Sequence, residues 1–272
     1  MIQTLIVIAA FLFCLGLGAV IAHLIGKKKT LKRAPKVLIA LVIGLVSFGL
    51  ASFGYLSTYS HADSSAYESF ESDVTVAVQE TENGYFFDGP GDTTNAIVFY
   101  PGAKVDEAAY APLLHRIAEH GVDCFLVHMP FHMAIFGSGS MSPLMADYEY
   151  KNWYMAGHSM GGMVAALDTS DHQGDIQGLI LLAAYPTKEL GNQVRLLSLY
   201  GTEDKVLNAS AYEDCKKNWP DNAAEIVIEG GNHAQFGCYG EQSGDGIAQI
   251  SADEQQGITA DEVVKFIASD SK

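Results

Sequence analysis

Residues 152–166 read NWYMAGHSMGGMVAA. A short apolar run leads to Gly157, Ser159 occupies the centre of a G-x-S-x-G pattern, and small or apolar residues follow. This order predicts a strand, a sharp turn and a helix, which is the setting of a nucleophilic serine. The glycines suit a strained turn with backbone passing close by, and the start of the next helix favours developing negative charge. Ser159 is therefore the candidate nucleophile.

The partners of such a serine follow later in the chain. A serine hydroxyl needs a base, and the base needs an orienting carboxylate. Asp204 comes after the apolar run VRLLSLY (residues 194–200), and His233 comes after AEIVIEGG (residues 224–231). Both stand where a strand is expected to end. We expect Asp204 to be the acid, with neighbouring Glu203 as the alternative, and His233 to be the base.

An oxyanion formed at the serine would need backbone donors. The N–H of Met160, directly after the nucleophile, is the first candidate. The second comes from the turn YPGAK (residues 100–104), where Ala103 is preferred and Gly102 is the alternative. Lys104, His158 and Gln235 are the candidates for lining the pocket.

Strand and helix patterns alternate from residue 73 to the end. DVTVAVQE (residues 73–80) and GYFFDG (residues 84–89) predict a hairpin, and residues 106–121 have helical spacing. Further short apolar runs alternate with amphipathic segments, which indicates a mostly parallel sheet with helices on both faces. The fold class is α/β, with one domain over residues 73–272.

Several segments together resemble the α/β-hydrolase fold-5 family, which is related to dienelactone hydrolases. They are YPGAKVDEAAYAPLLHRIAEHG, FLVHMPFHMAIFG, GHSMGG, YGTEDKV and, most specific of all, GGNHAQFGCYGEQSGDG. The similarity covers about residues 74–268 and implies an α/β-hydrolase fold with Ser159, Asp204 and His233 as the triad. Dienelactone hydrolases use a cysteine nucleophile, so serine at this position favours general ester chemistry. Pro-Gly-Ala replaces the Pro-Gly-Gly that relatives often carry, and leaves an N–H available.

Two apolar runs, about residues 2–25 and 37–58, precede this domain. Each is long enough to cross a bilayer. A signal peptide would need positive charge before the first run, and none is present; two buried helices of a soluble protein are the other alternative. The basic residues fall in the loop 26–36, which the positive-inside rule places in the cytoplasm. Residues 1–58 are thus predicted to form a transmembrane hairpin, with the catalytic domain on the extracytoplasmic side of the cell membrane.

Charge is distributed unevenly along the chain. Residues 1–62 hold six of the 16 basic residues and no acidic one, so the remainder carries 32 acids against ten bases, a formal charge of −22. Such a domain is repelled by phosphate backbones, which argues against nucleic-acid binding. The Ser- and acid-rich residues 59–72 suit a solvated polar tether.

The predicted function is a membrane-anchored serine hydrolase that cleaves an ester or similar small acyl substrate through an acyl-enzyme. An acyltransferase with the same triad is the near alternative, and a non-catalytic binding or adhesion domain is the alternative from another class. No cofactor or metal is expected, and His128 and His132, four apart, are assigned to the pocket rim or the surface. No strand–turn–helix pattern surrounds Cys238, so it is not a nucleophile candidate. The sequence leaves open whether Cys215 and Cys238 form a disulfide bridge.

Overall fold

The computed structural model describes residues 2–29 and 32–269. The chain divides into two compact units, Met1–Thr58 and Tyr59–Lys272. Each unit is described by itself.

The first unit is a pair of long helices, α1 (Ile2–Lys29) and α2 (Arg33–Leu56). Residues 30–31 of the predicted basic loop lie outside the described residues. The helices pack closely at Gly18, where an added Cβ would lie 2.2 Å from the carbonyl oxygen of Ala40. The stretches Val7–Lys27 and Arg33–Leu56 are long and apolar enough to cross a membrane, with mean hydropathies of 2.5 and 2.4. The helices continue into the basic segment on both sides because lysine and arginine are good helix formers.

The second unit is built on an eight-stranded sheet with the order β1-β2-β4-β3-β5-β6-β7-β8. The strands β3 to β8 run parallel, whereas β1 and β2 form an antiparallel hairpin at one edge. Their bounds are β1 Ala77–Thr81, β2 Gly84–Asp88, β3 Asn95–Tyr100, β4 Asp123–Val127, β5 Asn152–His158, β6 Ile176–Leu182, β7 Arg195–Gly201 and β8 Ala224–Ile228.

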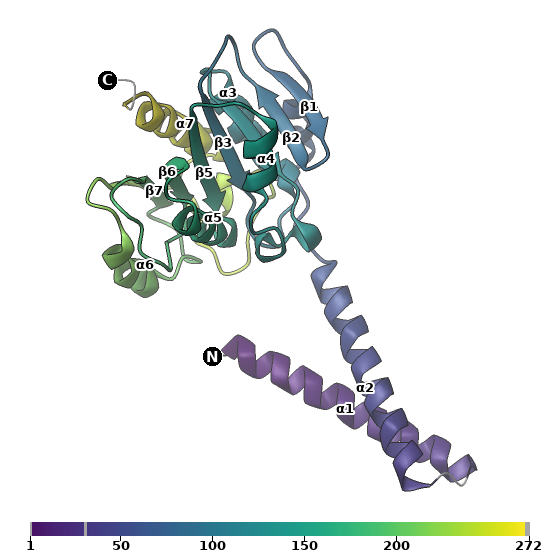
Figure 1. Ribbon diagram of the computed structural model, residues 1–272. Coiled ribbons are helices and arrows are strands. Elements are labelled where there is room, and N and C mark those ends of the chain that lie inside the picture. The colour runs from purple at the N-terminus through teal and green to yellow at the C-terminus, as the bar shows by residue number, and fades with distance from the viewer. Residues whose placement is uncertain (1, 30–31, 270–272) are drawn as a thin grey trace. The chain divides into compact units, whose positions relative to one another are not determined.

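Helices cover both faces of this sheet (Figure 1). The α-helices of this unit are α3 Ala111–Ala118, α4 Met141–Asp147, α5 Met160–Asp171, α6 Ala209–Cys215 and α7 Ala252–Ala268. Leu113 of α3 and Val263 of α7 belong to one buried core, while Leu144 of α4 and Val164 of α5 belong to the other. The predicted α/β class, with a mostly parallel sheet between two helical layers, is confirmed.

The start of β1 differs from the sequence pattern. The hairpin forms as predicted, but β1 begins at Ala77 and the side chain of Val74 is fully exposed. The carboxylate of Asp73 accepts the N–H groups of Thr75 and Val76, at 2.6 and 2.8 Å. This side-chain turn occupies the donors that a strand would need, so the alternating valines do not extend the sheet.

Residues 59–72, predicted to be a solvated tether, pack on the rest of the second unit. They include a short 3-10 helix, η1 (Ser64–Phe70), in which Ala66 is completely buried. The ring of Phe70 lies 4.3 Å from that of Tyr85 on β2, centroid to centroid. A few apolar residues within a polar segment are enough to hold it on the domain.

The predicted helix over residues 106–121 also differs in extent. The segment 106–121 begins as a 3-10 turn, η2 (Glu107–Tyr110), before α3, because Pro112 is accommodated only in the first turn of an α-helix. The last helix starts at Ala252, where Ser251 caps it by accepting the N–H of Glu254 at 3.1 Å.

Candidate active site

The site lies where the chain changes direction across the sheet. From β3 the chain passes through α3 to β4 on one side, and then crosses back to β5 on the other side of β3. The loops after β3 and β5 therefore diverge at their carboxyl ends, which is where open α/β sheets hold ligands. Ser159 follows β5 directly, and the turn that starts at Pro101 follows β3.

Ser159 has a strained backbone. Its φ and ψ are 53° and −123°, a region that side-chain-bearing residues rarely adopt. The N–H of Ser159 donates to the carbonyl of Leu182 on β6 at 2.9 Å, and its own carbonyl accepts the N–H of Met163 at 3.1 Å. The strand on one side and the helix on the other hold the serine in this conformation.

Glycine is required at three positions around this turn. An added Cβ would lie 2.6 Å from the carbonyl carbon of Gly161 if placed on Gly157, and 2.1 Å from the carbonyl oxygen of Tyr100 if placed on Gly161. On Gly162 it would lie 2.5 Å from the Cβ of Ala184. The glycines thus let β5, α5 and the end of β3 meet around Ser159.

Asp204 and His233 are directly hydrogen-bonded. Nδ1 of His233 lies 2.8 Å from Oδ2 of Asp204, and both side chains are almost completely buried. The other oxygen of Asp204 accepts the N–H groups of Val206 and Leu207, at 2.9 and 2.8 Å. Because Nδ1 of a neutral His233 donates to the carboxylate, Nε2 is left as the acceptor. The aspartate, rather than the alternative Glu203, contacts the histidine.

Asp245 braces both of the loops that carry these residues. Its Oδ1 accepts the N–H of Lys205 at 3.2 Å, and its Oδ2 accepts the N–H of Ala234 at 2.9 Å. Those donors directly follow Asp204 and His233 in the chain. One carboxylate therefore fixes the separation of the two loops.

Gln255 on α7 holds the residue before the histidine. Its Oε1 accepts the N–H of Asn232 at 2.9 Å, and its Nε2 donates to the carbonyl of Asn232 at 2.8 Å. Gln255 is completely buried. A polar residue on the buried face of a helix is the one signal in the sequence that could have found it.

The turn after β3 contains one backbone N–H without a hydrogen-bond partner among the described residues. The N–H of Gly102 donates to the hydroxyl of Tyr110 at 3.1 Å, and the N–H of Lys104 donates to the carbonyl of His132 at 2.6 Å. Within the described residues, the intervening N–H of Ala103 has no such partner. Met160 is the first residue of α5, so its N–H has no partner within the helix. This geometry favours Ala103 over the alternative Gly102 as the second donor.

His158 directly precedes Ser159 in the chain. It is 1% exposed, and its ring centroid lies 4.6 Å from that of His233. Burial lowers the pKa of His158 well below its usual range, and the positive charge available to His233 lowers it further. Nδ1 of a neutral His158 can therefore accept the hydroxyl proton of Tyr110, whose oxygen lies 2.8 Å away.

The other pocket candidates lie close to this centre. Lys104 is half-buried and has a positive φ of 57°. Gln235 follows His233 by two residues, and its Oε1 is buried with no hydrogen-bond partner among the described residues. His158, by contrast, is enclosed in the interior, so its side chain supports the elbow from within.

His128 and His132 share one carboxylate. Nδ1 of His128 lies 2.6 Å from Oε1 of Glu107, and Nδ1 of His132 lies 3.2 Å from Oε2. The two histidines thus both face the carboxylate of Glu107 on η2, and His132 is mostly buried rather than fully at the surface. All four cysteines, which include Cys215 and Cys238, are free thiols, so the structure contains no bridge between those two.

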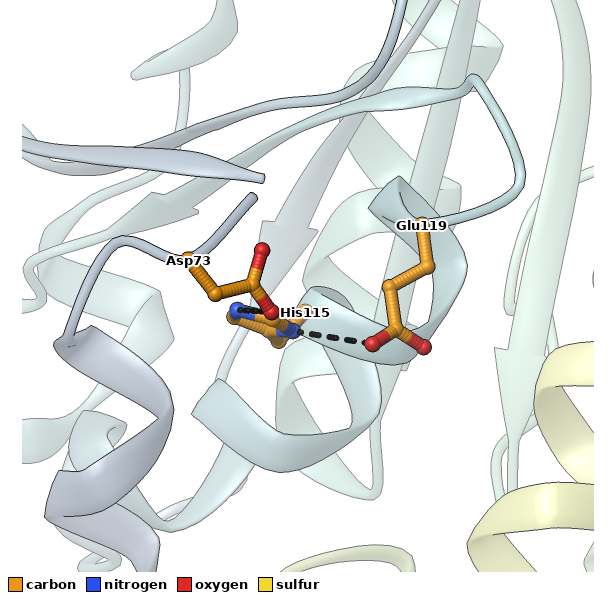
Figure 2. Close-up of side chains that lie close together, drawn as sticks. All are labelled: Asp73, His115 and Glu119. Atoms are coloured by element: carbon orange, nitrogen blue, oxygen red, sulfur yellow. Dashed lines mark ion pairs between the residues drawn. The ribbon is translucent and has the colours of Figure 1, made fainter. Parts of the chain in front are cut away.

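A second cluster of titratable groups consists of His115 on α3, Glu119 just after that helix, and Asp73 in the turn before β1 (Figure 2). One ring nitrogen of His115 lies 3.8 Å from Asp73 and the other lies 3.8 Å from Glu119. Because the two carboxylates face different nitrogens of one ring, the arrangement is that of two ion pairs. Backbone hydrogen bonds from Val76 and Thr75 also lower the pKa of Asp73. The cluster ties the turn before β1 to α3.

Comparisons with known proteins agree with this fold. A predicted CIB-like hydrolase from Thermoplasma acidophilum has 14% sequence identity and a TM-score of 0.51, covering 70% of this chain and 99% of its own. Est1E from Butyrivibrio proteoclasticus has 15% identity and a TM-score of 0.50, covering 72% and 98%. No curated protein sequence matches significantly. The family described as the alpha/beta hydrolase family matches residues 96–257, which is more than half of the chain. The protein therefore belongs to the alpha/beta hydrolase family.

Proposed function

We propose that the protein is a membrane-anchored serine hydrolase that cleaves a carboxylic ester or a similar acyl compound. The observation that carries the proposal is the strained backbone of Ser159 at the end of β5, combined with the buried Asp204–His233 pair at the same edge of the sheet. A strained turn of this kind projects the hydroxyl out of the sheet, where a substrate can reach it.

Each residue has a defined role in the proposed reaction. The hydroxyl oxygen of Ser159 attacks the ester carbonyl while Nε2 of His233 takes its proton. Asp204 holds the imidazole tautomer and stabilises the imidazolium. The N–H groups of Ala103 and Met160 donate to the oxyanion. His233 then protonates the leaving alcohol, and water cleaves the acyl-enzyme with the same histidine as base.

The helices α1 and α2 support the membrane anchor, because both are long and apolar enough to cross a bilayer. The basic segment between them favours a cytoplasmic loop, which places the catalytic unit outside. Protease treatment of sealed cells tests this placement. Cleavage of the catalytic unit in intact cells is expected, and protection until the membrane is opened would contradict it.

Hydrolysis of p-nitrophenyl esters by the full chain in detergent micelles tests the activity. Ser159→Ala and His233→Ala are each expected to lower the rate by about three orders of magnitude or more. A rate in Ser159→Ala equal to that of the wild type would contradict the proposal. Transfer of the acyl group to an added alcohol in place of water would identify the acyltransferase variant of the same chemistry.

A further inference from the structure

The loop that follows β4 exposes a compact group of apolar side chains. Phe131, Ile135 and Phe136 are 44%, 61% and 54% exposed, and we call these three residues the apolar patch. The ring centroids of the two phenylalanines lie 6.0 Å apart. From Tyr59 onward, the described chain exposes seven large apolar side chains, and three of them fall in this one loop. Such clustering marks an interaction surface.

The patch lies in a stretch without acidic residues. Residues 124–146 contain no Asp or Glu, although the chain from residue 63 onward has a formal charge of −22. A protein surface that enters a lipid headgroup region has to avoid carboxylates, which are expensive to desolvate. The loop meets this requirement in a domain that is otherwise strongly acidic.

The apolar patch lies on a loop with a strained backbone. Phe131 and His132 have φ values of 56° and 52°, in the left-handed region that disfavours residues with side chains. This conformation leaves Phe131 half exposed while the carbonyl of His132 accepts the N–H of Lys104 at 2.6 Å. Strain of this kind gathers at functional sites.

That same hydrogen bond joins the patch to the proposed site. Lys104 directly follows Ala103, the proposed oxyanion donor, in the turn after β3. The patch therefore lies on the loop that braces the oxyanion turn, and it borders the place where an ester would bind.

The chain that leaves α2 is fastened to these same two loops. The N–H of Ser60 donates to the carbonyl of Lys104 at 2.8 Å, and the N–H of Asp106 donates to the carbonyl of Ser60 at 2.9 Å. The ring of Tyr59 stacks on that of His132 with centroids 3.8 Å apart. Since α2 ends at Leu56, only two residues separate it from Tyr59, and the step from Leu56 to Tyr59 spans roughly 10 Å when fully extended.

We propose that the apolar patch inserts into the bilayer that α2 crosses, and that the substrate is an acyl ester resident in that bilayer. This inference rests on the proposed function, because it names the substrate class of the same site. The acyl–oxygen bond of the lipid breaks as the bond to the hydroxyl oxygen of Ser159 forms, and His233 passes the serine proton to the departing alcohol. Water then releases the fatty acid.

Insertion is tested without any need for activity. The full chain is placed in phosphatidylcholine nanodiscs that contain lipid with a doxyl quencher near the headgroup, as Phe136→Trp or as the matched control Ile247→Trp. Position 247 is 91% exposed and lies outside the patch. Tryptophan at 136 is expected to emit at shorter wavelength and to be quenched by the doxyl lipid, whereas tryptophan at 247 is not. Equal quenching at both positions would overturn the proposal, and so would a blue shift at 136 without quenching, which would indicate a second copy or another protein on the patch.

The substrate class is tested by comparing two esters in the same nanodiscs. The ratio of the rate on a bilayer-embedded long-chain ester to the rate on soluble p-nitrophenyl acetate is expected to fall at least about tenfold in Ile135→Ser/Phe136→Ser, since burial of apolar side chains is lost. The matched control Val227→Ser/Ile247→Ser is expected to keep the wild-type ratio. An equal loss on both esters in the patch variant would overturn the assignment. Absence of Ser159-dependent hydrolysis of either ester by the wild type would instead contradict the proposed function, and the quenching result would still decide the insertion.

Discussion

The hydroxyl oxygen of Tyr110 lies 2.8 Å from Nδ1 of His158 and also accepts the N–H of Gly102 at 3.1 Å. One buried side chain, at the end of η2 and directly before α3, thus connects the turn after β3 with the residue before Ser159. Burial raises the pKa of Tyr110, so its proton is retained. The two loops at the switch point of the sheet are held together by this hydroxyl group.

Removal of that hydroxyl should disturb the site more than the fold. Tyr110→Phe leaves Gly102 N–H and His158 Nδ1 unpaired, and we expect a loss of about 1–3 kcal/mol in the free energy of unfolding. We also expect kcat to fall about tenfold or more with little change in KM, because the oxyanion donor shifts. The matched control is Tyr212→Phe, which loses a buried hydrogen bond to Ser198 and a partly buried one to Glu225. A comparable fall in kcat in the control would show that the effect is merely one of stability.

Asp245→Asn should separate the two loops that carry the acid and the base. Oδ1 of the aspartate accepts the N–H of Lys205 and Oδ2 accepts the N–H of Ala234, and in asparagine one of these two oxygens is replaced by an NH2 group that cannot accept. We expect kcat for ester hydrolysis to fall about tenfold or more as His233 shifts relative to Asp204. Steady-state kinetics with a short ester measure this. An unchanged kcat would mean that the loops hold their positions without Asp245.

The identity of the acid is tested by a pair of neighbouring variants. Asp204→Asn should lower kcat by about four orders of magnitude, because the amide can favour the wrong tautomer of His233. Glu203→Gln should stay close to the wild-type rate, since the Glu203 side chain bonds only to the exposed Gln249 among the described residues. A larger loss in Glu203→Gln than in Asp204→Asn would reverse the assignment.

His158 should make stability depend on pH. Because burial lowers its pKa, the folded protein keeps the ring neutral, whereas the unfolded chain binds a proton there below about pH 6.5. The free energy of unfolding should therefore fall as the pH drops through about 6.5, by up to roughly 1.4 kcal/mol per pH unit from this group. His158→Gln should flatten that slope. Urea unfolding followed by the fluorescence of Trp153 and Trp219 between pH 5 and 8 measures it, and equal slopes in both proteins would contradict the expectation.

The sequence predicts the parts of this protein that depend on local pattern. Gly157, Gly161 and Gly162 indicate the elbow because only glycine fits where three backbone segments meet. Apolar runs identify the buried parallel strands, because a strand that is covered on both faces needs apolar side chains on both faces. Val74 misleads, because a side-chain turn at Asp73 competes with strand pairing, and alternation alone does not reveal that competition.

Long-range polar contacts are the part that the pattern leaves open. Gln255 and Asp245 hold the His233 loop by hydrogen bonds to its backbone groups. Both residues are distant from His233 in the sequence or are not marked by any local pattern. The choice between Ala103 and Gly102 depends on a hydroxyl from Tyr110, eight residues beyond Gly102. The packing of residues 59–72 depends on Tyr85 and His132, which no local pattern links to that segment.

The central claim is that Ser159 is an activated nucleophile, and covalent labelling tests it most directly. The full chain in detergent micelles is treated with a fluorophosphonate, and the modified peptide is located by mass spectrometry. We expect one phosphonate on Ser159, none in Ser159→Ala, and labelling slowed by about three orders of magnitude in His233→Ala. An unlabelled Ser159 in the folded wild-type protein, or equal labelling in His233→Ala, would contradict the account.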